Sequence, residues 1–167
     1  MDKLIFHSRA ALLRDNNNPY GLPPDAGRIL SNFGDIPVIW RGRTYPTVEH
    51  AFQAAKYLLA SSRPDLESSI RLNGGDPVAA KRMGSRAGMK AVNAVLDVAL
   101  WNSISDDVMT ELITEKAKNP IVRSILQKCR DNGIRLYHFS RSDLRWGCHI
   151  NPPKGQNRLG TIYMQVW

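Results

Sequence analysis

The stretch Tyr-Pro-Thr-Val-Glu-His-Ala-Phe-Gln-Ala-Ala-Lys, residues 45–56, predicts a turn that leads into a helix. Its proline disfavours the helical conformation for the tyrosine before it. Thr47 is suited to cap the helix, because its hydroxyl can accept a hydrogen bond from a backbone N–H of the first turn. From Val48 onward, apolar residues recur at helical spacing. We therefore predict an amphipathic helix that begins after Thr47 and ends near residues 60–62.

A polar stripe accompanies the apolar face of this helix. Glu49, Gln53 and Lys56 stand at positions i, i+4 and i+7, so their side chains share one side of the helix. A carboxylate, an amide and an ammonium in a row could contact a ligand. The same row also fits a solvated surface, where the helix dipole stabilises a glutamate in the first turn. Spacing alone leaves both interpretations open.

The composition is that of a globular protein with an excess of positive charge. The 167 residues are 43% hydrophobic and 23% charged, which is ordinary for one domain with its own core. The net charge of +8 favours phosphorylated or polyanionic partners without naming one. No apolar run is long enough to span a bilayer, and the apolar stretch near the start is too short for a signal peptide. We expect an intracellular, cytoplasmic protein without membrane contact, and its two cysteines fit a reducing compartment.

Capping and turn signals along the rest of the chain predict a single α+β domain over residues 1–167, dominated by helices. Its β-structure should be limited to a small hairpin and short strands. The predicted strands lie at residues 4–6 and 134–139, the hairpin lies around 41–42, and a loop lies at 14–28. Besides the helix after Thr47, we predict four helices: one at 66–72, one that begins after Asp76-Pro77, one from Ser105 to about 118, and one at 121–130.

Several kinds of catalytic site find no support in the sequence. The four histidines are scattered, and no CxxC or HExxH spacing occurs, so we expect no metal. The chain has no Gly-x-Ser-x-Gly elbow for a serine nucleophile. It also lacks the glycine-rich phosphate loops of Rossmann and P-loop proteins. We therefore expect no cofactor either.

A set of motifs in fixed order resembles the NADAR family, the YbiA-like N-glycosidases. The string Thr-Val-Glu-His-Ala-Phe-Gln-Ala-Ala-Lys is similar to the signature of that family. The resemblance covers about residues 29 to 167, nearly the whole chain. The other matching pieces are Leu30-Ser31-Asn32-Phe33, Trp101 with Met109, Asp143-Leu144-Arg145-Trp146-Gly147, and Gly155 to Gly160 followed by Met164.

This resemblance implies an enzyme that hydrolyses the bond between ribose C1′ and a nitrogen. Such a reaction develops positive charge on the sugar, which a fixed carboxylate stabilises while it activates the attacking water. By the resemblance, Glu49 is the essential carboxylate and Asp143 a second catalytic acid. Family members often carry a glutamate five residues before that aspartate, where this chain has His138. If that glutamate donates a proton in those members, we predict His138 as the replacement donor; if the glutamate is structural there, its absence changes nothing in the reaction.

The resemblance also implies a set of substrate-binding residues. Aromatic rings would stack on the leaving base, cations would bind phosphates, and amides would orient the sugar. The predicted substrate-binding residues are Asn32, Phe33, His50, Gln53, Lys56, Trp101, Trp146, Gly147 and Asn157.

Two substrate classes are implied by the family. One is ADP-ribose attached to guanine in DNA or RNA, and the other is the ribosylamino-pyrimidine phosphates of riboflavin biosynthesis. The charge of +8 favours the first, because it attracts a nucleic-acid backbone. The alternatives are a non-catalytic module for ADP-ribose or NAD-derived nucleotides, against which Glu49 argues, and a general basic nucleic-acid-binding protein. The sequence makes no prediction of an oligomeric state.

Overall fold

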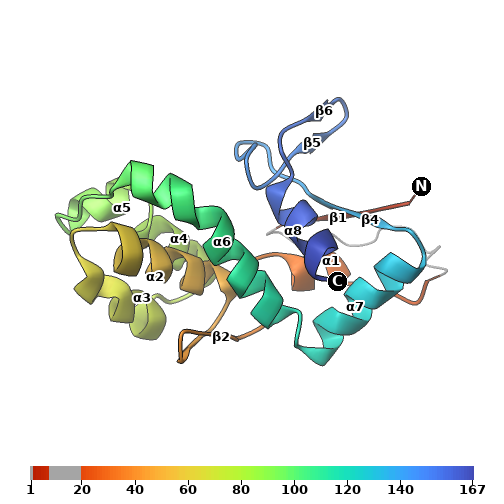
Figure 1. Cartoon of the computed structure of the whole chain (residues 1–167), viewed down its shortest axis with the longest axis horizontal. Coiled ribbons are helices and arrows are strands. Elements are labelled where there is room, and N and C mark those ends of the chain that lie inside the picture. Colours follow the sequence, from red (N-terminus) through yellow and green to blue (C-terminus); the bar gives the residue numbers. More distant parts are fainter. Residues whose placement is uncertain (1, 8–19) are drawn as a thin grey trace. The chain divides into compact units, whose positions relative to one another are not determined.

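The computed structural model describes residues 2–7 and 20–167. The chain divides into two compact units (Figure 1). Unit 1 consists of Met1–Gly34 and Lys116–Trp167, and unit 2 consists of Asp35–Glu115, so unit 2 is inserted into unit 1 along the chain. The prediction of a helix-dominated α+β chain with short strands is confirmed. The prediction that residues 1–167 form one domain stays a prediction.

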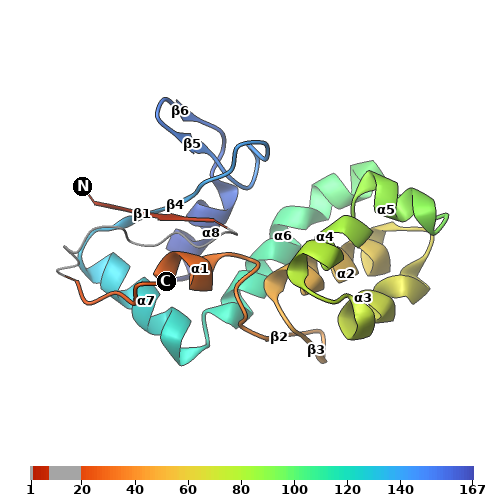
Figure 2. The ribbon, with the colours of Figure 1, turned by 180° about the vertical axis from the view of Figure 1, so that it is seen from behind.

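Helix α2 (Val48–Ala60) is the buried helix of unit 2, and it has the predicted limits. Thr47 caps it as predicted, since its side chain accepts a hydrogen bond from the His50 N–H at 3.2 Å. The helix packs against α3 (Glu67–Asn73), α4 (Pro77–Met83) and the strands of a hairpin (Figure 2). Most of its residues are buried, including Glu49 and Gln53 of the polar stripe at 6% and 5% exposure. The interpretation of this stripe as a solvated surface is therefore wrong.

The predicted hairpin is formed by β2 (Val38–Trp40) and β3 (Arg43–Tyr45). Its two-residue loop has positive φ at Arg41 (49°) and Gly42 (76°), the conformation that matches the right-handed twist of antiparallel strands. The hairpin ends at Tyr45, whose hydroxyl donates to Glu67 Oε1 at 2.6 Å. Glu67 is itself 3% exposed and also accepts hydrogen bonds from Arg43 and Arg71, at 2.7 and 3.0 Å.

Helix α3 has no capping side chain, whereas other helices of unit 2 begin at one. The structure places α3 at Glu67–Asn73 after a short 3-10 turn, η1 (Pro64–Leu66). Asp76 caps α4 (Pro77–Met83) as predicted, and Ser85 caps a separate helix, α5 (Arg86–Ala91).

The predicted helix start at Ser105 is wrong. Helix α6 (Val98–Lys116) begins a full two turns earlier, where the Asp97 side chain accepts a hydrogen bond from the Leu100 N–H at 3.0 Å. Ser105 is instead a buried residue in the middle of the helix. Asp97 and Ser105 are both of capping type, and no helix-breaking residue separates them, so the helix extends to the earlier one.

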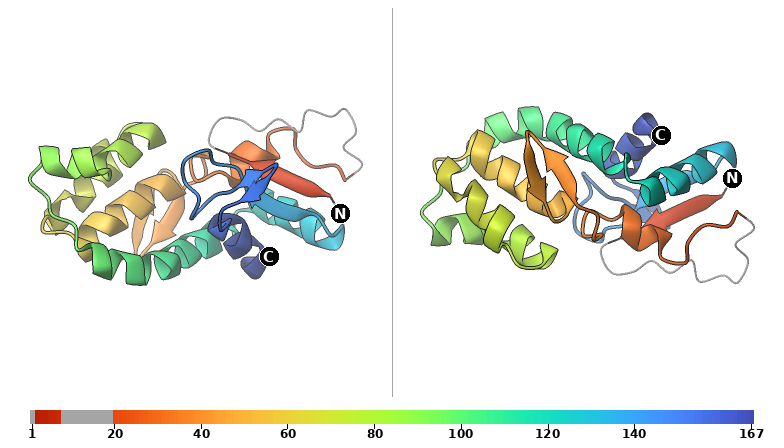
Figure 3. Two further views of the ribbon diagram at one scale, coloured as in Figure 1. Left: turned by 90° about the horizontal axis from the view of Figure 1, so that it is seen from above. Right: turned by 90° about the horizontal axis from the view of Figure 1, so that it is seen from below.

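Unit 1 contains a parallel pair of strands far apart in sequence. Strand β1 (Lys3–Phe6) pairs with β4 (Arg135–His138) in the register Leu4↔Leu136 (Figure 3). Phe6 contacts Tyr163 of α8 (Arg158–Val166) edge-on, with ring centres 5.7 Å apart. The helices packed around this pair are α1 (Ala26–Leu30), α7 (Pro120–Asp131) and α8 (Arg158–Val166).

Unit 1 also has regular structure within the predicted loop at 14–28 and in a second hairpin. The predicted loop at 14–28 falls partly outside the described residues, and its last residues belong to α1. Near the C-terminus, β5 (His149–Ile150) and β6 (Pro153–Lys154) form a hairpin with a cis Asn151-Pro152 bond. Among the described residues, no helix has the length and apolarity that crossing a membrane requires.

Candidate active site

Glu49 lies in the first turn of α2, where its carboxylate is buried and oriented. Its Oε1 accepts a hydrogen bond from Gln53 Nε2 at 2.8 Å, one helical turn further along. A carboxylate can only accept, so the Gln53 amide must turn its nitrogen toward Glu49. The helix dipole adds stabilisation for a negative charge at this end. Glu49 is therefore a fixed anionic group at the end of a buried helix.

Lys56 follows on the same side of α2. Its Nζ donates to the Gly84 carbonyl at 3.0 Å and lies 5.9 Å from the centre of the Trp101 ring. Burial lowers the pKa of Lys56 below its ordinary value; the charge of Glu49 opposes this shift and that of Lys81 adds to it. Lys56 is thus a cation held next to an aromatic ring and within the field of the Glu49 carboxylate.

Trp101 comes from the first turn of α6 and is 7% exposed. Its ring lies against Phe52 of α2, with centres 5.1 Å apart. The contact brings α6 onto the helix that carries Glu49. The structure therefore brings four of the predicted site residues of unit 2 together, namely Glu49, Gln53, Lys56 and Trp101.

His50, the remaining predicted residue of unit 2, uses both ring nitrogens within the protein. Nε2 lies 2.9 Å from the Gly75 carbonyl and Nδ1 lies 2.8 Å from Thr47 Oγ1. Because a carbonyl can only accept, Nε2 carries a proton. The ring links the start of α2 to the turn before α4. Its predicted role in substrate binding stays a prediction.

In unit 1, Asp143 organises the turn that carries Trp146. Its Oδ1 accepts hydrogen bonds from the N–H groups of Arg145 at 3.1 Å and Trp146 at 3.0 Å. The half-buried indole of Trp146 lies under the Arg145 guanidinium, 5.3 Å from the ring centre. At Gly147 a Cβ would come within 2.6 Å of the Ser140 Cβ, so only glycine fits there. These contacts stabilise the turn itself, and the predicted catalytic role of Asp143 stays a prediction.

His138 and Asn157 contact each other in unit 1. Asn157 Oδ1 accepts from the His138 N–H at 2.9 Å, and its Nδ2 donates to the Leu136 carbonyl at 3.0 Å. Both polar ends of the amide thus bind the backbone of β4. His138 Nδ1 lies 3.2 Å from the Trp146 carbonyl and must donate to it, while the ring stacks on Phe6 with centres 5.2 Å apart.

Asn32 and Phe33 are half-buried in the turn after α1. The Phe33 N–H donates to Ser31 Oγ at 3.1 Å. The Ser31 carbonyl accepts from Nζ of the buried Lys116 at 2.7 Å. The backbone of this turn is therefore held by side chains of unit 1, and the predicted substrate contacts of Asn32 and Phe33 stay predictions.

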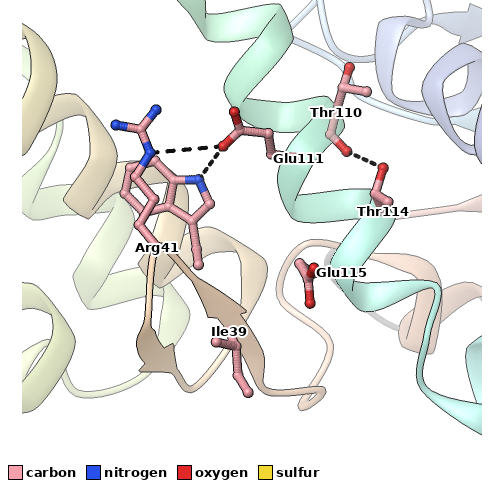
Figure 4. Close-up of a pocket in the computed structure, with 7 residues that line it drawn as sticks. Ile39, Arg41, Thr110, Glu111, Thr114 and Glu115 are labelled. Carbon is pink, nitrogen blue, oxygen red and sulfur yellow. Dashed lines mark hydrogen bonds and ion pairs between the residues drawn. The ribbon is translucent and has the colours of Figure 1, made fainter.

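Unit 2 also has an open cleft of about 390 Å³ between the β2–β3 hairpin and α6 (Figure 4). The indole N–H of Trp40 donates there to Glu111 Oε2 at 2.6 Å, and Arg41 lies 4.0 Å from the same oxygen. None of the predicted site residues lines it, and we assign it no chemistry. The lining residues are Ile39, Trp40, Arg41, Thr110, Glu111, Thr114 and Glu115.

Comparison with known proteins decides the family. Residues 23–167 match the model of the NADAR domain. This chain belongs to the NADAR family. It is 30% identical to N-glycosidase YbiA of Shigella boydii over 151 residues, which cover 89% of this chain and 84% of the relative. N-glycosidase YbiA of Escherichia coli K12 is also 30% identical, over 150 residues with the same coverage.

A solved structure agrees with this assignment. The NMR structure of the E. coli protein YbiA has a TM-score of 0.70 with this chain at 27% identity. The match covers 99% of this chain and 84% of that one. The predicted family is confirmed. The prediction of an enzyme is confirmed at the level of the class, since the curated relatives are named N-glycosidases, hydrolases that act on N-glycosyl bonds.

Sequence reasoning missed Gly84. Its carbonyl accepts the hydrogen bond from Lys56, and its Cα lies against the Gln53 amide. A glycine after a helix is common, and nothing in the sequence connects this one with residues some thirty positions earlier. Only the packing of α4 on α2 shows the connection.

Proposed function

We propose that this chain is an N-glycosidase that hydrolyses the bond between ribose C1′ and a nitrogen, and that it removes ADP-ribose from ADP-ribosylated guanine in nucleic acid. The observation that carries the proposal is the Glu49 carboxylate, buried at the start of α2 and oriented by Gln53. Moving a carboxylate out of water has a desolvation cost that its hydrogen bonds must offset, so a chemical role is a good reason for its presence.

The reaction requires a negative charge close to the sugar. As the C1′–N bond breaks, its electron pair leaves with the nitrogen and positive charge develops on the ribose. A fixed carboxylate stabilises this charge and can accept a proton from the water that attacks C1′. The departing nitrogen takes up a proton, so that one water is consumed for each bond broken. We assign the role of the carboxylate to Glu49.

Lys56 and Trp101 supply the complementary binding chemistry. Lys56 is a phosphate-binding cation whose position is set by the Gly84 carbonyl and the Trp101 ring. An ADP-ribosyl group carries two phosphates, and the ribosylamino-pyrimidines carry one, so Lys56 suits either class. The net charge of +8 favours a substrate attached to nucleic acid, because each phosphate of the backbone adds to the attraction.

The proposal is tested with both substrate classes side by side. The purified protein is incubated with a guanine-ADP-ribosylated oligonucleotide and, separately, with ribosylamino-pyrimidine phosphates, and released sugar is measured by mass spectrometry. We expect release of ADP-ribose from the oligonucleotide, with faster turnover at low salt. Release only from the pyrimidine phosphates would contradict the proposed substrate but keep the reaction.

Two further outcomes would contradict the reaction itself. Tight binding of ADP-ribose without release from either substrate would identify a non-catalytic binding module. Salt-sensitive binding of the oligonucleotide that ignores the ADP-ribosyl group would identify a general nucleic-acid-binding protein.

A further inference from the structure

Gly84 ends helix α4 in a conformation that does not require glycine. Its φ of −85° and ψ of −1° lie in the right-handed region that any residue adopts. Its N–H donates to the Ala80 carbonyl at 3.2 Å, as at an ordinary helix end. An alanine here would normally stabilise a protein by reducing the freedom of the unfolded chain. Any constraint on a side chain at this position therefore comes from the space around it.

The space beside the Gly84 Cα is occupied by the side-chain amide of Gln53. A Cβ on residue 84 would lie 2.6 Å from Gln53 Cδ and would overlap Oε1. Gln53 Oε1 is buried and accepts no hydrogen bond from the described residues. The group that faces it is the Cα–H of Gly84, a weak donor. The amide is thus confined between Gly84 on its oxygen side and Glu49 on its nitrogen side.

The backbone carbonyls of Met83 and Gly84 also contact two neighbouring polar side chains of α2. The Gly84 carbonyl accepts from Lys56 Nζ at 3.0 Å, and the Met83 carbonyl accepts from the Tyr57 hydroxyl at 2.7 Å. Residues 83–84 therefore define the positions of three consecutive polar groups along one side of the helix that carries Glu49.

From this packing we infer that Gly84 is a positioning residue for the reaction: it orients Glu49 through the Gln53 amide, and Gln53 acts on the carboxylate rather than on the substrate. The inference rests on the proposed function, in which Glu49 is the carboxylate that acts at the ribose. It also revises the predicted substrate-binding role of Gln53.

The test compares Gly84→Ala, Gln53→Ala and the double variant. The new methyl group displaces the Gln53 amide, so Gly84→Ala should lower kcat roughly 10- to 100-fold, the range for losing a hydrogen bond to a charged group. KM should stay unchanged, because the substitution keeps the backbone carbonyl that positions Lys56, and Gln53 acts on the carboxylate rather than on the substrate. The acid limb of the pH–kcat profile should move to higher pH, since the carboxylate loses a donor that favours its charged form.

The double variant separates positioning from damage to the fold. Gln53→Ala removes the side chain that the methyl group overlaps, so the double variant should regain the thermal stability that Gly84→Ala loses. Its kcat should nevertheless equal that of Gln53→Ala alone, because both changes remove one and the same contact. Ser85→Ala is the matched control at the same junction. It removes the cap of α5, which should lower the melting temperature without changing kcat or the pH profile.

Two results would overturn the inference. One is a Gly84→Ala variant with the kcat and pH profile of the original chain. The other is a double variant whose losses in kcat multiply, which would mean that the two residues act independently. If the unaltered chain releases no sugar from either substrate class, the proposed function itself fails. This outcome differs from a failure of the inference on Gly84, in which the unaltered chain is active.

Discussion

Lys56 connects the proposed site with a measurable dependence on pH. Burial lowers its pKa below the ordinary lysine value of 10.5. The ammonium therefore loses its charge at a lower pH than an exposed lysine does, and its attraction for phosphate is lost as the pH rises through that lowered pKa.

We predict that the affinity for ADP-ribose falls roughly tenfold or more as the pH rises, at pH values where exposed lysines are still charged. This is the loss expected when a hydrogen bond to a charged group is removed. Isothermal titration calorimetry between pH 7 and 10 measures the affinity for ADP-ribose. Lys56→Arg should remove the fall, because arginine stays charged over this range. A pH dependence identical in the two proteins would show that Lys56 does not bind the phosphates.

Two substitutions of Asp143 can separate its role in the turn from its proposed role in the reaction. Its Oδ1 accepts two backbone N–H groups, and an asparagine can accept both through its own Oδ1. We predict that Asp143→Asn keeps the melting temperature but loses sugar release, whereas Asp143→Ala loses both. Thermal unfolding and the release assay measure the two effects. An Asp143→Asn variant with full activity would limit Asp143 to organising the turn.

The identities of the candidate residues could be predicted from the sequence, but their contacts could not. By spacing alone Glu49, Gln53 and Lys56 also fit a surface stripe. In the structure α4 packs on α2, and Trp101 of α6 lies against Phe52 and next to Lys56. Asn157 was predicted to orient the sugar through its amide, and in the structure both polar ends of this amide bind the backbone of β4. Asparagine binds backbone groups readily, and tertiary structure alone decides which ones it meets.

The helices and strands show where local chemistry suffices. Thr47 and Asp76 were predictable helix starts, because a capping side chain satisfies N–H groups only two or three residues away. The start at Ser105 was wrong because an equally suitable cap, Asp97, lies earlier in a stretch without a helix breaker. The parallel pairing of β1 with β4 has no local signal, because its partners lie more than a hundred residues apart.

The connection of the hairpin to α3 depends on a buried carboxylate. Glu67 accepts from the hydroxyl of the fully buried Tyr45, whose pKa is raised by burial and then by the neighbouring Glu67. We predict that Tyr45→Phe lowers the free energy of unfolding by about 1–3 kcal/mol, since the buried Glu67 carboxylate loses one of its donors and keeps those of Arg43 and Arg71. Urea unfolding measures the change.

Tyr137→Phe is the control for that experiment. Tyr137 is only half-buried in β4, so losing its hydroxyl should change the free energy of unfolding by less than about 0.5 kcal/mol. Equal effects of the two substitutions would contradict a special role for the Tyr45–Glu67 contact.

For the chain as a whole, Lys116 links stability to pH. Its amine is fully buried, and burial lowers its pKa to about 7 from 10.5. Between these two values the unfolded chain binds a proton that the folded chain does not. The free energy of unfolding should therefore rise as the pH increases through this window, by up to about 1.4 kcal/mol per pH unit.

We predict that Lys116→Met removes this rise, because methionine fills the space without a charge. Urea unfolding of both proteins from pH 6 to 9.5 measures the difference between the slopes. The Ser31 carbonyl keeps the Gly34 N–H as a donor at 2.9 Å, so the variant should still fold. Parallel slopes for the two proteins would show that Lys116 keeps an ordinary pKa.

The central claim, that Glu49 carries the reaction, is tested most directly by the rate of ADP-ribose release from a guanine-ADP-ribosylated oligonucleotide by Glu49→Gln. A glutamine has the same shape and can still accept from Gln53, so the fold and the melting temperature should not change. We predict a rate lower by roughly 10²–10⁴-fold, the usual contribution of a carboxylate that moves a proton in the transition state. A rate within a few-fold of the unaltered chain would contradict the account.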